Sequence, residues 1–129
     1  MTRLAIPMIL AVAGEGCSAA NAQPYDSGNP VHCMVIYGAT SGTARTGPLA
    51  DELNARIVHL VRSNGGVEWL REITPLTTQL GAQWEASPDR EGIVRLFTEC
   101  RANQDADPSF RAALPQLMRE GRAISSSAR

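Results

Sequence analysis

The sequence contains no lysine, and all 12 of its basic residues are arginine. This absence excludes mechanisms that need a lysine amine, such as a Schiff base, a Ser-Lys dyad or a P-loop. Basic and acidic residues nearly balance, 12 against 13, so the formal net charge is -1. A nucleic-acid binder needs a concentrated positive surface, whereas these arginines are spread along the chain. We therefore expect no nucleic-acid partner.

Long hydrophobic runs are absent as well. The stretch from Leu4 to Ala13 is uncharged and mostly apolar, but it is too short to span a bilayer as a permanent helix. Arg3 precedes it and the small residues Ala20 and Ala22 follow it, which is the layout of a secretory signal peptide. We predict a signal peptide over residues 1–22, cleaved after Ala22, and a periplasmic or secreted protein with no stable membrane insertion.

Two alternatives exist for this N-terminal segment. A lipoprotein would be anchored through Cys17, but the charged Glu15 interrupts the residues that lipidation requires before the cysteine. A buried N-terminal helix would leave the small residues before Gln23 without a role. We favour export with cleavage over both.

Cysteine is scarce, with three in the whole chain. Removal of a signal peptide would take Cys17 and leave Cys33 and Cys100. In an oxidising compartment this pair is expected to form one disulfide, which closes a loop of about 70 residues. Neither cysteine lies in a C-x-x-C motif, so a reactive thiol is the less favoured interpretation.

Aromatic residues make up only 5% of the chain, which indicates a modest core. Several prolines follow a residue that can cap a helix, as in Asn29-Pro30 and Asp107-Pro108. Together with apolar residues at helical spacing, this pattern predicts an all-α fold: a small bundle of four to five short helices, stapled by the disulfide. The predicted helices are 30–43, 48–63, 67–86, 88–103 and 108–121.

Two of these segments have an alternative interpretation. Residues 31–37 are rich in β-branched side chains and could form a strand, but the chain offers no convincing partner strand. Pro75 should kink the third helix or split it into 67–74 and 75–86. The helical domain is expected to span 30–121. A flexible arm over 23–29 would precede it, and a frayed tail over 122–129 would follow it.

Motifs for catalysis and metal binding are missing. The chain has no H-E-x-x-H, no C-x-x-C-H for haem and no G-x-S-x-G. His59 lies off the apolar stripe of its helix and should be solvated, and His32 lies beside the predicted disulfide. Glu68 and Glu72 share a helix face that we also expect to be solvated. We predict no enzymatic activity, no cofactor and no metal site.

Trp69 and Trp84 are the remaining features of interest, because they lie about four helical turns apart. They are either core residues or aromatic anchors at a protein interface. We expect a small exported, non-enzymatic helical protein that acts through contact with another envelope protein. One alternative is a bundle that binds a small apolar ligand or cofactor between the helices at 30–43, 48–63 and 88–103. A further alternative is an envelope-stress chaperone that exposes apolar surface in acid.

Overall fold

The computed structural model describes residues 25–127, and every regular element within this range is a helix. The predicted all-α fold is confirmed, and residues 31–37 belong to a helix. The predictions of a signal peptide over 1–22 and of lipidation at Cys17 lie outside the described residues. The helices are α2 (Pro30–Ala44), α3 (Pro48–Asn64), α4 (Val67–Ala86), α5 (Arg90–Asp105) and α6 (Pro108–Ser127).

Capping residues set the helix boundaries. Pro30 opens α2, and the Asn29 side chain accepts a hydrogen bond from the Val31 backbone nitrogen at 2.9 Å. Helix α5 begins two residues later than predicted because Asp89 is its cap and accepts from the Gly92 nitrogen. Gly65 ends α3 with a φ of 132°, a conformation that glycine adopts without steric cost.

Helix α4 continues through Pro75, so the predicted split into 67–74 and 75–86 is not observed. The Pro75 side chain is exposed, which lets its ring point away from the core. Threonine hydroxyls support the backbone around the proline. Thr74 donates to the Leu70 carbonyl at 2.7 Å, and Thr78 donates to the Thr74 carbonyl at 3.0 Å.

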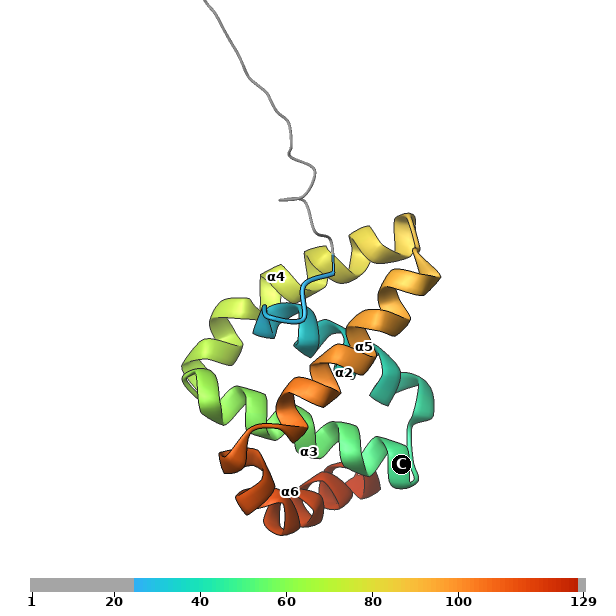
Figure 1. Ribbon diagram of the computed structural model, residues 1–129. Coiled ribbons are helices and arrows are strands. Elements are labelled where there is room, and N and C mark those ends of the chain that lie inside the picture. Colours follow the sequence, from blue (N-terminus) through green and yellow to red (C-terminus); the bar gives the residue numbers. More distant parts are fainter. Residues whose placement is uncertain (1–24, 128–129) are drawn as a thin grey trace, which may run out of the picture.

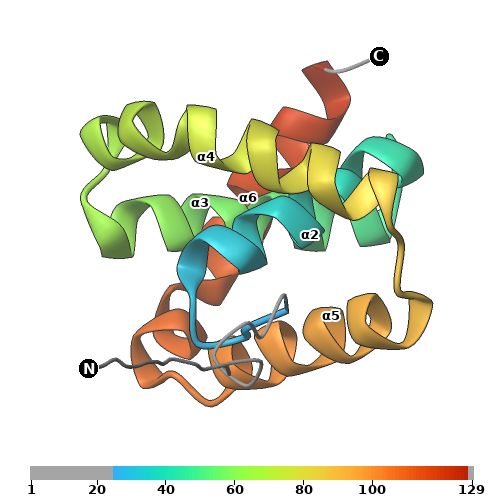
Figure 2. The ribbon, with the colours of Figure 1, turned by 90° about the horizontal axis from the view of Figure 1, so that it is seen from above.

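The helices form three layers. Figure 2 shows α4 and α5 on opposite sides of α2 and α3. Helix α6 packs against α3 and crosses it obliquely (Figure 1 and Figure 2). The main core lies between α2, α3 and α5 and includes Tyr37, Leu53 and Leu96. A smaller core between α3 and α6 is built on Phe110 and Leu117.

The predicted disulfide connects two of these layers. The sulfur atoms of Cys33 on α2 and Cys100 on α5 lie at disulfide distance, and their Cα atoms are 5.8 Å apart. Both side chains are buried in the main core. The bond therefore ties α5 to the centre of the molecule.

The structure describes residues 25–29 of the predicted arm and residues 122–127 of the predicted tail. Residues 25–29, which we call the N-terminal strap, pack against the helices, and Tyr25 is only 3% exposed. At the other end, α6 extends to Ser127 instead of fraying after Gly121. Ser125 is buried, and its hydroxyl donates to the Gly121 carbonyl and accepts from the Asn54 amide. The helical domain thus reaches beyond the predicted limit at residue 121.

Gly121 explains how α6 approaches α3 so closely. A Cβ at this position would overlap the Asp51 carbonyl oxygen and lie 2.8 Å from the Ala55 nitrogen. Both neighbours are backbone atoms of α3, so they cannot rotate away. Glycine is therefore required for this helix crossing.

We expect Gly121→Ala to lower the free energy of unfolding by about 2 kcal/mol, the usual effect of overpacking. Gly42→Ala is the matched control, since nothing lies within 4 Å of a Cβ there. Because Gly42 also lies in a helix, its replacement should stabilise the protein by about 0.5–1 kcal/mol. Urea unfolding of both variants checks the opposite signs, and equal effects would contradict the close-packing explanation.

Candidate functional site

A pocket of about 280 Å³ opens between α2, α3 and α5, where the sequence placed an apolar ligand cavity. Its floor contains Tyr37, Leu60 and the Cys33–Cys100 pair. The other lining side chains include His59 and Gln104, so the pocket is more polar than predicted.

His59 is buried in this pocket and not solvated as predicted. The Gln104 side-chain nitrogen donates to His59 Nδ1 at 3.1 Å, which places the proton of the neutral ring on Nε2. The orientation of the Gln104 amide is fixed by its other end, where the oxygen accepts from Tyr37 at 3.0 Å and from Arg56 at 3.3 Å. Burial lowers the pKa of His59, and the Asp107 carboxylate partly opposes this effect. The neutral ring is therefore favoured.

Ser109, His59 and Asp107 lie close together but do not form a catalytic triad. In a triad the carboxylate accepts from one histidine nitrogen while the other nitrogen takes the serine proton. Here His59 Nδ1 faces an amide donor, and the Ser109 hydroxyl donates to Asp107 at 2.9 Å. The serine proton is thus held by the carboxylate, and the geometry gives no support to nucleophilic catalysis.

Arg56 is the charged centre of this network and is only 5% exposed. Its guanidinium pairs with Glu52 at 2.8 Å and Asp105 at 2.9 Å, and it lies 5.1 Å from the centre of the Phe110 ring. The Tyr37 hydroxyl remains a donor because burial raises its pKa to about 12. These groups satisfy one another without a ligand, so the network is best explained as a structural one.

The structure also bears on the predicted carboxylate pair, metal ligands and membrane spans. Glu68 and Glu72 are exposed, as expected. Within residues 25–127 no group of three or more His, Cys, Asp or Glu side chains could hold a metal ion. In the same range, no helix combines the length and apolar character that a membrane span needs.

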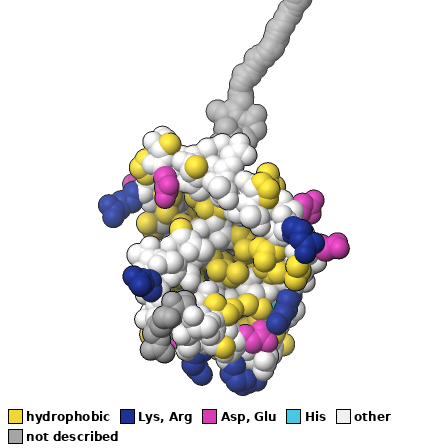
Figure 3. Space-filling view, turned by 180° about the vertical axis from the view of Figure 1, so that it is seen from behind, with side chains coloured by type: hydrophobic (Ala, Val, Ile, Leu, Met, Phe, Trp, Pro, Cys, Tyr) yellow, Lys and Arg dark blue, Asp and Glu magenta, His cyan; other side chains and the backbone are white. Residues whose placement is uncertain are grey.

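The surface over α2 and α4 differs from the rest of the molecule because it lacks charge. Helix α2 contains no Asp, Glu, Lys or Arg, and α4 contains none between Ile73 and Trp84. We call this surface the α2–α4 face. Leu70 is 39% exposed and Leu76 is 50% exposed on it. In the view from the α4 side, hydrophobic side chains gather near the middle and charged ones lie toward the edges (Figure 3).

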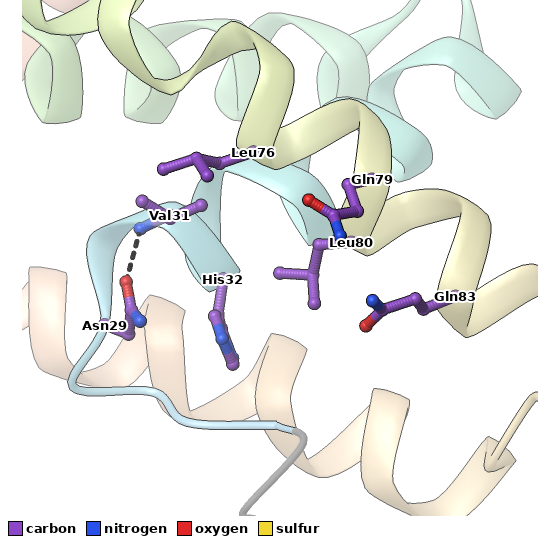
Figure 4. A pocket seen from close by; sticks show the side chains of 7 residues that line it. All are labelled: Asn29, Val31, His32, Leu76, Gln79, Leu80 and Gln83. Atoms are coloured by element: carbon purple, nitrogen blue, oxygen red, sulfur yellow. Dashed lines mark hydrogen bonds between the residues drawn. The ribbon is translucent and has the colours of Figure 1, made fainter.

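Two grooves flank the crossing of α2 and α4. The first groove, of about 300 Å³, has Leu76, Leu80 and Val31 as its apolar part and carboxamides at its edge. Figure 4 shows Leu76 and Leu80 reaching from α4 toward α2, with His32 beside them. The amide side chains are Asn29, Gln79 and Gln83. The second groove, of about 280 Å³, is lined by Met34, Val35, Gly38, Leu70, Thr77 and Thr78.

The two tryptophans line neither groove and lie in different environments, although Trp84 packs against His32 of the first groove. Trp84 is only 8% exposed and packs against Tyr25 and His32, so it is a core residue in this state and not an exposed anchor. Trp69 is half-buried near the start of α4. Sequence reasoning missed the absence of charge over 30–44 and 73–84. Both gaps are visible in the sequence.

Comparison of the chain with models of protein families, with curated proteins and with solved structures finds no match.

Proposed function

We propose that this protein is a non-enzymatic binding protein of the cell envelope whose α2–α4 face docks an apolar segment of another protein. The observation that carries the proposal is the charge-free, partly apolar surface with grooves on both sides of α4. Interface cores are depleted of charge and contain apolar anchors that fill pockets. The leucines exposed along α4 fit this description.

The edge of the first groove indicates the charge of the partner. Glu72 lies one helical turn before Leu76, and Glu68 lies one turn before Glu72, so both carboxylates extend the same side of α4. An apolar segment seated beside Leu76 would bring its flanking residues close to these carboxylates. The proposed partner therefore carries arginine or lysine next to an uncharged apolar stretch.

Two synthetic peptides test this proposal, each with the same leucine-rich uncharged centre. One is flanked by arginines and the other by glutamates. In an NMR titration, the arginine-flanked peptide should shift the Met34, Leu70 and Leu76 signals and bind about tenfold more tightly than the other peptide. Glu72→Lys should remove or reverse that preference.

Two surface variants, each replacing an exposed apolar residue by aspartate, test whether the peptide binds at the α2–α4 face. Leu76→Asp should abolish peptide binding, whereas Val94→Asp, at an exposed valine on α5, should leave it unchanged. If neither peptide shifts signals on the α2–α4 face, or if Leu76→Asp binds normally, the proposal is wrong.

A further inference from the structure

The N-terminal strap packs against Trp84 through the aromatic ring of Tyr25. The Tyr25 and Trp84 ring centres are 5.0 Å apart, and Tyr25 lies over Gly92 of α5. A Cβ at Gly92 would come within 2.6 Å of the Tyr25 ring, so the glycine makes room for the strap. The contact buries both aromatic side chains.

A hydrogen bond to a histidine ties the strap to α2. The Asp26 backbone nitrogen donates to His32 Nδ1 at 2.9 Å, so the docked strap requires an unprotonated Nδ1. The His32 ring also packs edge-on against Trp84 with the ring centres 5.6 Å apart. His32 therefore contacts both the strap and the aromatic surface that the strap covers.

We propose that protonation of His32 releases the N-terminal strap and uncovers Tyr25 and Trp84 beside the first groove. A protonated ring carries a hydrogen on both nitrogens, so Nδ1–H would point at the Asp26 N–H, and two donors would face each other. The hydrogen bond that holds the strap would then be lost. The released strap would also move Asn29, which lines the groove.

The surroundings of His32 give the direction of the pH dependence. Burial lowers the pKa of His32, and the Asp26 carboxylate opposes this effect. From α4, Trp84 packs against the ring and Gln83 lines the same groove, and both side chains are neutral. The carboxylate of Asp89, the cap of α5, lies beside Gly92 under the Tyr25 ring. The open form has an ordinary histidine pKa, so it binds more protons than the closed form as the pH falls through about 6.5. Acid therefore favours opening.

The closed form also carries a cost that opening relieves. The Trp84 indole nitrogen is buried and has no hydrogen-bond partner among residues 25–127. If release of the strap exposes this N–H, water satisfies it, which lowers the free energy of the open form relative to the closed form. Exposed Tyr and Trp side chains are strong interface anchors, so opening would enlarge the α2–α4 face. This last consequence rests on the proposed function, whereas the opening itself does not.

Fluorescence quenching tests the opening without any partner. In the full chain with Trp69→Phe, Trp84 is the only tryptophan, and acrylamide quenching of the tryptophan emission is compared at about pH 8 and about pH 5. We expect the quenching constant to rise about threefold at the lower pH. The exchange rate of the Asp26 amide, corrected for its intrinsic pH dependence, should rise in parallel.

His32→Asn in the same background is the matched control. Its side-chain oxygen can replace Nδ1 as the acceptor but does not titrate, so the quenching constant should stay at its higher-pH value throughout. A rise that persists in His32→Asn would overturn the proposal and point to His59 or the carboxylates. A flat profile in the histidine-containing protein would overturn it as well. Neither readout involves a peptide, so failure here is distinguishable from failure of the docking proposal.

Discussion

Replacing Cys33 and Cys100 together by alanine is expected to lower the free energy of unfolding by about 4 kcal/mol. The two residues are 67 positions apart in the sequence, so the bond removes much of the conformational freedom of the unfolded chain. Small domains have total stabilities of about 5–15 kcal/mol, and the loss would therefore be a large share of the whole. Urea unfolding of the oxidised protein and the double variant measures the difference.

The entropic explanation predicts that loss of the disulfide changes the unfolded state more than the folded state. If the bond mainly constrains the unfolded chain, the double variant should keep the helical circular dichroism of the parent under native conditions. Addition of a thiol reductant should lower the stability of the parent to that of the variant and leave the variant unchanged. A variant that loses its helical signal without denaturant would show instead that the bond is needed to assemble α2 and α5.

Much of the fold follows from local signals in the sequence. Proline after a capping residue marked the starts of α2 and α6, and Gly65 marked the end of α3. The pairing of Cys33 with Cys100 followed from counting cysteines after export was assumed. These features depend on residues close in sequence or on a single possible pair, and for that reason they could be predicted.

The features that were missed depend on distant partners. His59 was expected to be solvated because its apolar neighbours lie on another side of α3, but its burial depends on Gln104, 45 residues away. The docked strap likewise depends on the space above Gly92, which no local pattern reveals. Long-range polar contacts of this kind become visible only when the helices are assembled.

The predicted end of α6 at residue 121 was wrong for another reason, because the sequence contains a local signal for the longer helix. Gly121 and Ser125 are small residues four positions apart, a spacing that lets two helices approach closely. The expectation of a frayed tail over 122–129 does not use this signal. Likewise, the gap in charge between Ile73 and Trp84 could have indicated the α2–α4 face.

Arg56→Met is expected to lower the free energy of unfolding by about 3 kcal/mol, since it removes one member of a buried, hydrogen-bonded charge network. Methionine keeps much of the apolar volume against Phe110, so the loss should reflect the missing guanidinium. Gln104 would lose one of its donors at the oxygen, and Asp105 would lose its ion pair. Glu52 would retain Arg101 at 2.8 Å, which keeps the effect below the largest values known for buried pairs.

Arg95→Met is the matched control, because Arg95 pairs with Glu99 at the same i,i+4 spacing but on an exposed surface, at 3.5 Å. Surface pairs of this type contribute about 0.5 kcal/mol or less, so this variant should unfold near the parent midpoint. Both variants remove one Arg–Glu contact within a single helix. The difference between their losses of stability therefore measures the contribution of the buried surroundings of Arg56. Equal losses in the two variants would mean that the network around Arg56 stabilises the protein no more than a solvated pair, and the structural role assigned to that network would be wrong.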